Sequence, residues 1–246
     1  MSEMLQIRVI NLDRSYERLE FVSQGLNSSG LKWSRFPAIE LPESGWSDLE
    51  FYVKGQSKRF YWDDLSRGEL GCFLSHLGVM EQFLSSDKTL LLDLEDDVEF
   101  TAESAQYLLK ILDVLNHPDF GYWDCINLTS VYEKRRRILM DFGDWKIFRA
   151  FCFPMLSSGM LWSRPGVERF VRRVARDGIF LPVDQQVRYY LSEDGVGLSL
   201  DKPVIGLRSV STTIGDRRVG RPRYPVAKMK LRAHNYWHSF LARLLY

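Results

Sequence analysis

Short apolar runs along this chain alternate with longer segments in which apolar residues recur at helical spacing. Residues 6–12 predict a buried first strand, and residues 16–26 predict a helix because Leu19, Val22 and Leu26 fall on one face. Residues 31–36 then predict a second strand. This opening strand–helix–strand unit favours a parallel sheet with right-handed crossovers.

The clearest helix is predicted at residues 66–84, where Ser66 and Glu69 have the spacing of a capping box ahead of an apolar stripe. The later elements alternate: a strand at 89–95, a helix through 107–115, strands at 122–128 and 154–163, a helix beginning near Pro165, a short helix at 181–195 and a strand at 196–204. Such alternation is typical of a doubly wound α/β fold, with a mostly parallel sheet and helices on both faces.

The C-terminal segment is basic and amphipathic. No acidic residue follows Asp216, and the basic residues after it are Arg217, Arg218, Arg221, Arg223, Lys228, Lys230, Arg232 and Arg243. Residues 226–246 predict a helix with one apolar face made of Met229, Ala233, Tyr236, Trp237, Phe240, Leu241 and Leu244. This pattern favours binding in the plane of an anionic membrane. The alternative is a helix docked on its own domain, or on a twin in a homo-oligomer.

These patterns divide the chain into an α/β domain at 1–215 and a basic tail at 216–246. A net charge of +1 gives no reason to expect a nucleic-acid partner. No apolar run approaches the roughly 18 residues that span a bilayer, and the N-terminus lacks the pattern of a signal peptide. Three scattered cysteines form neither a disulfide framework nor a zinc spacing. We therefore expect a reduced, cytoplasmic protein.

Four acids crowd the end of the apolar strand at 89–95: Asp93, Glu95, Asp96 and Asp97. In an extended chain Glu95 and Asp97 share one side, and Asp96 points to the other. The carboxyl end of a parallel strand is where α/β sheets bind ligands, and a divalent cation would offset the repulsion. Carboxylates suit Mg²⁺ or Mn²⁺. The alternative is a solvated acidic turn that caps the helix from Thr101.

Three motifs resemble glycosyltransferase family 25: VINLDRSYER at 9–18, GELGCFLSHL at 68–77 and LLDLEDDVEF at 91–100. The family groups bacterial lipopolysaccharide galactosyl- and glucosyltransferases with animal collagen galactosyltransferases. The resemblance covers roughly residues 6–215. It implies a GT-A-like fold, a UDP-galactose or UDP-glucose donor, and a DxD-like metal site matched by LEDD at 94–97.

The resemblance also implies roles for the acids. Asp97 would bind the metal, Glu95 would share the metal or bind the ribose, and Asp96 would belong to the donor site. Asp93 departs from the family, which is usually apolar there. It would either support the site or point sideways and cap something unrelated, and we favour the second.

Residues from other motifs would complete the donor site. Asn11, Arg14 and Arg18 could reach the uridine or its phosphates, since guanidinium groups suit that task. The alternative for both arginines is a solvated helix face. The segment SSG at 157–159, with Ser158 and Gly159 as the candidate contacts, matches a small-residue segment near the donor sugar, although a simple strand turn explains it equally well.

Other single residues have competing explanations. For His76 we favour a structural contact to the acidic loop over catalysis. Gly68, Gly71 and Gly78 weaken a helix, so they indicate close packing against the sheet or the donor.

Asp184 is the candidate general base, because an inverting transfer needs a group that takes the proton of the attacking hydroxyl. It opens a short helix within a PVD pattern that the family shares. Its alternatives are a helix N-cap and a contact to the donor sugar. Glu69 is a competitor, but the capping box already explains it.

These inferences predict an inverting, Mn²⁺- or Mg²⁺-dependent hexosyltransferase. It would move a hexose, with galactose favoured, from a UDP-sugar to a hydroxyl of a lipopolysaccharide or lipooligosaccharide core. It would act at the inner face of the cytoplasmic membrane, with the aromatic loop at 46–62 as an acceptor platform or a lid. The rivals are a metal-dependent phosphohydrolase or nucleotidyltransferase, and a non-catalytic membrane-bound carbohydrate-binding protein.

Overall fold

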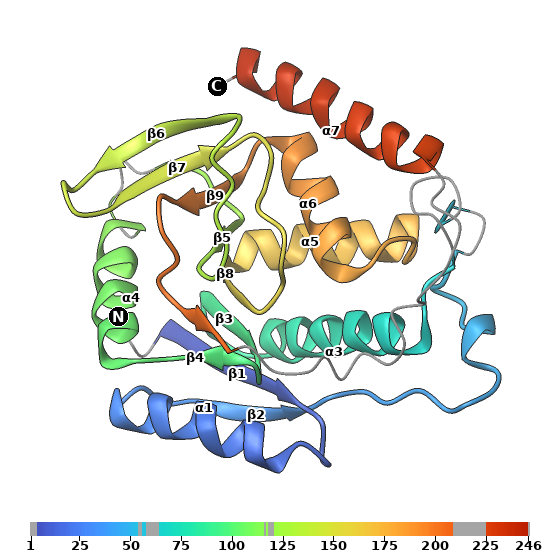
Figure 1. Ribbon diagram of the computed structural model, residues 1–246, viewed down its shortest axis with the longest axis horizontal. Coiled ribbons are helices and arrows are strands. Elements are labelled where there is room, and N and C mark those ends of the chain that lie inside the picture. The colour runs from blue at the N-terminus through green and yellow to red at the C-terminus, as the bar shows by residue number, and fades with distance from the viewer. Residues whose placement is uncertain are drawn as a thin grey trace.

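The computed structural model describes residues 4–53, 56–57, 64–115, 117, 121–208 and 225–245. Its centre is a sheet of eight strands (Figure 1). In sheet order the strands are β2 (Ser34–Pro37), β1 (Leu5–Asn11), β3 (Leu90–Glu95), β8 (Gly159–Ser163), β5 (Cys125–Asn127), β9 (Gly197–Leu200), β7 (Lys146–Ala150) and β6 (Arg136–Asp141). A small second sheet pairs β4 (Val98–Glu99) with β10 (Gly206–Leu207).

The prediction of a mostly parallel sheet is wrong. The pairs β1–β2, β1–β3 and β5–β9 are parallel, whereas β3–β8, β5–β8, β7–β9 and β6–β7 are antiparallel. The sheet is therefore mixed, with β8 and β7 running against the other six strands. No strand is predicted from the sequence between 129 and 153, yet β6 and β7 form a hairpin there. Gly143, with φ +84°, lies in its turn.

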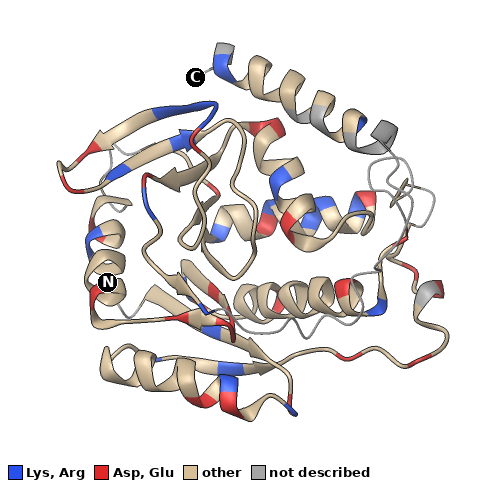
Figure 2. Ribbon diagram, viewed as in Figure 1, with Lys and Arg blue, Asp and Glu red and all other residues tan. Residues whose placement is uncertain are grey.

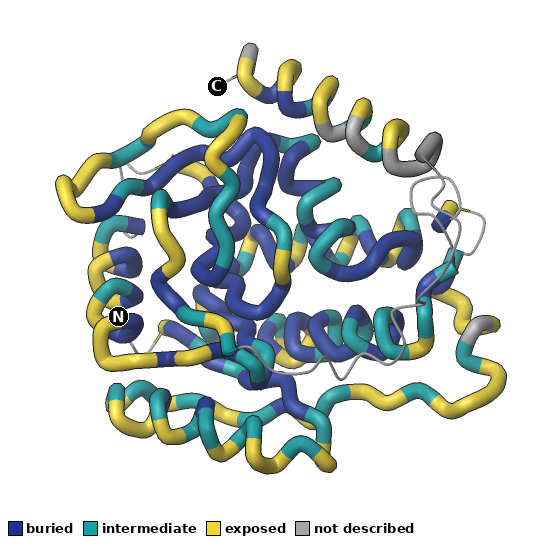
Figure 3. Tube along the Cα trace, in the orientation of Figure 1, coloured by how far each residue is buried: buried dark blue, intermediate teal, exposed yellow. Residues whose placement is uncertain are grey.

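Helices cover both faces of the sheet, as predicted. One face packs against α1 (Tyr16–Ser28) and α4 (Ala102–Leu115), and the other against α3 (Arg67–Leu84), α5 (Arg164–Asp177) and α6 (Val183–Asp194). Two apolar layers result, and they make the buried centre of the molecule (Figure 3). In β3, Leu90, Leu92 and Leu94 belong to the first layer and Leu91 to the second. Strand alternation therefore turns Asp93 and Glu95 toward α3.

The start of α3 follows the sequence signals. Ser66 Oγ accepts a hydrogen bond from the backbone of Glu69, and Glu69 Oε2 accepts one from the backbone of Ser66, so the capping box is confirmed. A Cβ at Gly71 would lie 2.6 Å from the carbonyl oxygen of Ile39. One at Gly78 would lie 2.7 Å from the Phe36 ring. These contacts confirm close packing of α3 against β2 and the segment that follows it.

The C-terminal segment forms the helix α7 (Pro225–Leu245), which lies beside α6 (Figure 1). It contacts the domain through one stripe and presents its aromatic stripe outward, where Tyr236, Trp237 and Phe240 are each more than half exposed. No helix among the described residues is long and apolar enough to cross a membrane. The predicted boundary at residue 216, the arginines at 217–223 and the aromatics at 60–62 lie outside the described residues.

Candidate active site at the carboxyl ends of the central strands

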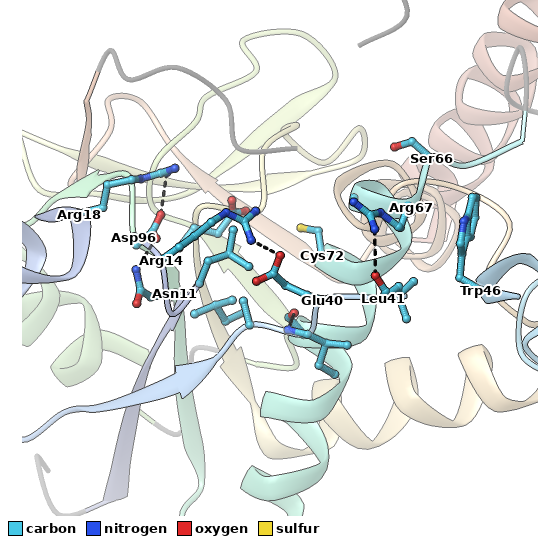
Figure 4. Close-up of a pocket in the computed structure, with 17 residues that line it drawn as sticks. Asn11, Arg14, Arg18, Glu40, Leu41, Trp46, Ser66, Arg67, Cys72 and Asp96 are labelled. Carbon is cyan, nitrogen blue, oxygen red and sulfur yellow. Dashed lines mark hydrogen bonds and ion pairs between the residues drawn. The ribbon is translucent and has the colours of Figure 1, made fainter. Parts of the chain in front are cut away.

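A cavity of about 510 Å³ opens at the carboxyl ends of β1 and β3 (Figure 4). This is the place where α/β sheets bind ligands. Its walls come from the start of α1, the segment after β2, the short 3₁₀ helix η2 (Trp46–Asp48) and the start of α3. Of the residues expected at the donor site, those that line the cavity are Asn11, Arg14, Arg18, Glu95 and Asp96.

Asp96 is held by two groups from the first βα unit. Asn11 Nδ2 donates to Asp96 Oδ2 at 2.7 Å, and Arg18 Nη2 lies 2.6 Å from Asp96 Oδ1. Arg35 Nε in turn donates to Asn11 Oδ1 at 3.0 Å, which fixes the amide. Burial raises the pKa of Asp96, while the bond from Asn11 and the charge of Arg18 oppose that rise. Both oxygens of Asp96 are therefore occupied by the protein.

Arg18 supplies positive charge among the clustered acids. The same nitrogen that contacts Asp96 lies 3.8 Å from Asp97 Oδ2, and the side chain is only 16% exposed. The solvated-face alternative is therefore wrong for Arg18. Arg14 is different, since its side chain is 56% exposed and pairs with Glu40 at the cavity wall. The protein itself thus offsets part of the repulsion that suggested a metal ion.

Asp97 keeps a buried oxygen that accepts no hydrogen bond from the described residues, namely Oδ1. Burial, followed by the negative charge of Glu95, raises the pKa of Asp97 to about 6. A cation beside this oxygen would relieve both effects. The expected alternation of the acids fails here because β3 ends at Glu95 and the chain turns, so Arg18 reaches both Asp96 and Asp97.

The capping alternative for the acidic turn is not supported. Thr101 Oγ1 itself accepts a hydrogen bond from the backbone of Ser104, at 3.1 Å, at the start of α4. The acids at 95–97 lie before this cap: Glu95 and Asp96 line the cavity, and Arg18 contacts Asp96 and Asp97.

Glu95 is surrounded by donors. Ser157 Oγ donates to Glu95 Oε1 at 2.6 Å, and His76 Nε2 lies 3.4 Å from the same oxygen. Burial alone would raise the pKa of Glu95, but His76, Ser157 and Arg18 together lower it. This carboxylate is therefore ionised. Ser157 belongs to the predicted segment at 157–159, but its contact with Glu95 was not predicted.

Asp93 and His76 form a fully buried pair behind Glu95. Asp93 Oδ2 lies 2.6 Å from His76 Nδ1, and neither side chain has exposed surface. Burial alone would lower the pKa of His76, but Asp93 holds it well above its ordinary value. The preference for Asp93 pointing sideways is therefore wrong, because Asp93 supports the acidic loop through His76. The expected structural contact from His76 to that loop is confirmed.

One cysteine, Cys72, lies close to two residues of the site. Ligand atoms of Cys72, His76 and Glu95 all lie within 4.8 Å of one another. Burial and the charge of Glu95 raise the pKa of the Cys72 thiol. A protonated thiol and a protonated imidazole are poor metal ligands, so this trio does not favour a soft-metal site.

Asp184 does not line the cavity, but its carboxyl group lies close enough to Glu95 for their charges to interact. Pro182 occupies the N-cap position of α6, so the cap alternative is wrong for Asp184. Burial raises the pKa of Asp184, and the negative charge of Glu95 raises it further. Hydrogen bonds from the backbone N–H groups of Gln185 and Leu156 oppose this rise. Leu156 has φ +77°, a conformation that is strained for a side chain of this kind. Asp184 thus also supports the loop that carries Ser157.

The predicted contacts at 158–159 take part mainly in the sheet. The carbonyl of Ser158 accepts from the backbone of Glu95 at 2.9 Å. A Cβ at Gly159 would meet Thr129 at 2.6 Å, so the space beside this glycine is already filled. A contact from either residue to a sugar stays a prediction.

These observations define an α/β protein whose strand ends carry a buried carboxylate cluster beside a ligand-sized cavity. Its sequence matches the family described as glycosyltransferase family 25 (LPS biosynthesis protein) over residues 4–151, and the chain belongs to that family. The matched segment includes the Asn11, Arg18, His76 and acidic-cluster positions. It ends before Ser158, Gly159 and Asp184.

Relatives in animals are similar over about half of the chain. A glycosyltransferase 25 family member from Aedes aegypti is 28% identical over 145 residues, which are 57% of this chain and 23% of that protein. Procollagen galactosyltransferase 2 from Homo sapiens is 26% identical over 125 residues, 49% of this chain and 20% of that protein. The alignments thus span about a fifth of the length of these relatives.

Because Asp93 and His76 form a buried pair, we expect substitutions of the two residues to have strongly non-additive effects on the free energy of unfolding. Asp93→Leu removes the carboxylate partner of the buried His76, and His76→Leu leaves Asp93 buried without its charged partner, so each should cost about 3–5 kcal/mol. The double variant should cost less than the sum by about 1–3 kcal/mol. Urea denaturation of the four proteins measures this coupling.

The exposed pair Asp141–Lys146 is the matched control, and its cycle should be close to additive. Additive losses at Asp93 and His76 would contradict the assigned pair.

Proposed function

We propose that this protein is an inverting glycosyltransferase that moves a hexose, with galactose favoured, from a UDP-sugar to a hydroxyl of a lipopolysaccharide or lipooligosaccharide core. The observation that carries the proposal is the buried Asp97 Oδ1, which accepts no hydrogen bond from the described residues and whose carboxylate interacts with ionised Glu95, a residue of the cavity wall. The family description names LPS biosynthesis, and one relative is named a galactosyltransferase. The GT-A-like assignment of the fold belongs to this proposal.

The cavity suits a nucleotide diphosphate sugar. Its volume of about 510 Å³ lies within the usual range for small-molecule sites. Arg14, Arg18 and Arg67 offer guanidinium groups for the phosphates, and Trp46 offers a flat apolar surface. Arg14 is exposed, so its pairing with Glu40 can yield to a phosphate at little cost.

The acids fit a hard divalent cation. Asp97 Oδ1 is the free oxygen, and Glu95 is an ionised neighbour, so these two residues would hold Mn²⁺ or Mg²⁺ while donor phosphates complete the coordination. When bound, the ion supplies positive charge to the leaving diphosphate. Asp96, occupied by Asn11 and Arg18, would hold Arg18 in position toward the same phosphates.

Asp184 is the proposed general base. Its raised pKa makes the ionised carboxylate a stronger base, and its interaction with Glu95 supports a role near the reacting end of the donor. The N–H groups of Gln185 and Leu156 would hold the carboxylate in one orientation. Taking the proton of the acceptor hydroxyl during attack leads to inversion at the anomeric carbon.

Calorimetry with UDP tests the metal site. UDP should bind the native protein more tightly with Mn²⁺ than without it, and Asp97→Asn should remove the Mn²⁺-dependent gain, on the order of 10- to 100-fold in affinity. Asp87→Asn, at a side chain that is 90% exposed, is the control and should bind like the native protein.

Equal UDP affinity of the native protein with and without Mn²⁺ would refute the metal site. Hydrolysis of UDP-hexose without transfer to core glycans would favour the phosphohydrolase instead. Binding of a glycan without UDP binding and without hexose transfer would support the non-catalytic carbohydrate-binding protein.

Substitution of Asp184 separates base catalysis from loop support. Asp184→Asn should lower kcat by roughly 10²- to 10⁴-fold and leave UDP affinity unchanged. Because the ionised form is the base, the native kcat/KM should fall as pH drops through the raised pKa of Asp184. A parallel loss of UDP affinity would instead show that Asp184 acts by holding the loop at 154–158.

The outward stripe of α7 supports a peripheral location on the inner face of the cytoplasmic membrane. Lys and Arg positions occur on β6 and on α7 (Figure 2). The guanidinium of Arg135, next to β6, lies 4.1 Å from the centre of the exposed Tyr236 ring. Exposed aromatic rings flanked by positive charge match an anionic lipid surface, which would bring the enzyme to a lipid-linked acceptor.

Vesicle co-sedimentation tests this location. The native protein should bind vesicles that contain anionic lipid, and Trp237→Ser with Phe240→Ser should weaken binding at least about tenfold, because two exposed apolar rings are lost. Tyr16→Ser, at an exposed ring on α1, is the control. A dimer in solution that the double variant converts to a monomer would assign the stripe to a twin instead.

A further inference from the structure

The contact between α6 and α7 brings together two matched pairs of side chains. On α6, Tyr189 and Glu193 are four residues apart and so lie on one face. On α7, His234 and His238 have the same spacing. The two faces meet, because His234 stacks on Tyr189 and His238 lies beside Glu193. None of these residues lines the cavity at the strand ends.

Three of these side chains converge on one point. Ligand atoms of Glu193, His234 and His238 all lie within 4.8 Å of one another, and His238 Nδ1 is 3.8 Å from Glu193 Oε1. In a tetrahedral zinc site with bonds of about 2.0–2.1 Å, neighbouring ligand atoms are about 3.3–3.5 Å apart. Small side-chain rotations would therefore close the three groups around an ion.

Neighbouring groups orient each of the ligands. The His234 ring stacks on Tyr189 with centroids 3.9 Å apart and planes 5° apart. Arg173 pairs with Glu193 Oε2, which leaves Oε1 facing His238. Arg173 also lies 2.8 Å from Asp194, so its positive charge is shared with a second carboxylate. Contacts of this kind hold the side chains of His234 and Glu193 in place.

The chemistry of the trio selects the ion. Two imidazoles and one carboxylate suit zinc, whereas Mg²⁺ and Mn²⁺ prefer oxygen ligands only. Two histidines four residues apart on a helix are a known way to grip zinc from one face. Burial, then the charge of His238, lowers the pKa of His234 to about 4, so its ring is neutral at pH 7.

We propose that Glu193, His234 and His238 bind one Zn²⁺ ion, and that this ion fastens α7 to α6. The described contact surface of α7 contains few apolar groups, since Ala242 and Ser239 are its buried side chains and Leu231 is partly buried. An ion bridging the two helices would add the attraction that these small side chains cannot supply. It would also keep the aromatic stripe of α7 turned outward.

Zinc titration of the full chain, purified without a histidine tag and stripped of metal, tests the site. Competition with a chromophoric chelator should show one zinc equivalent, and His234→Ala or His238→Ala should weaken its binding at least 100-fold. His117→Ala is the matched control and should bind like the native protein. Circular dichroism of each variant confirms that the fold is retained.

Cobalt substitution and proteolysis make the test specific. Co²⁺ at this site should give a tetrahedral spectrum without a sulfur charge-transfer band, and the spectrum should be unchanged by Cys72→Ser. Zinc should also slow tryptic cleavage within α7 at least severalfold in the native protein and not in His238→Ala.

Three results would overturn the proposal. The first is a native protein that binds no zinc at micromolar metal, and the second is unchanged affinity in both histidine variants. The third is a cobalt spectrum with a sulfur band that Cys72→Ser removes, because it would place the ion at the strand ends.

Discussion

The compensation of buried negative charge at the carboxyl end of β3 is the constraint on which the site depends. Arg18 comes from α1 and His76 from α3, so the charges of the acids are balanced from both faces of the sheet. Unpaired ionised carboxylates would be costly in the interior, and these contacts oppose the rise in pKa that burial causes in the acids. Among the described residues, Asp93 Oδ1 and Asp97 Oδ1 both accept no hydrogen bond, but Asp93 is fully buried whereas Asp97 is partly exposed, so Asp97 is the point at which the site can gain a further cation.

The supports of the site reach well beyond the acids. Ser157 holds Glu95 from a loop that is itself held by Asp184 and by Asn127, whose Nδ2 donates to the carbonyl of Leu156 at 2.8 Å. Leu156, with its strained backbone, persists in this loop because Asp184 and Asn127 hold its N–H and carbonyl groups. The C-terminal helix α7 is packed differently. It contacts the domain through a narrow stripe of small and polar side chains, and its aromatic rings are exposed to solvent. The buried, hydrogen-bonded site and the exposed aromatic surface of α7 are thus separate parts of the molecule.

Much of the secondary structure was predicted correctly, because it depends on interactions between residues that are close in the sequence. The capping box of α3, the apolar run of β3 and the period of α7 depend on residues that are near in the chain. The motif resemblance identified the family and the region of the cavity. The hairpin of β6 and β7 gave a weaker signal, because β6 lies at the sheet edge and is largely exposed. Strand direction also escaped prediction, since periodicity is the same in parallel and antiparallel pairs.

By itself the sequence determined the family, the helices on both faces of a central sheet, and the crowding of acids at one strand end. Only the tertiary structure decided the partners of those acids. Asn11, Arg18 and His76 lie far from the acids in the chain, and folding alone brings them into contact. Strand alternation in β3 turns Asp93 toward the same side as Glu95, but only the packing of α3 against that side shows that His76 is its partner. Electrostatic balance depends on distances in space, so a linear pattern can show that charges need partners without showing which residues provide them.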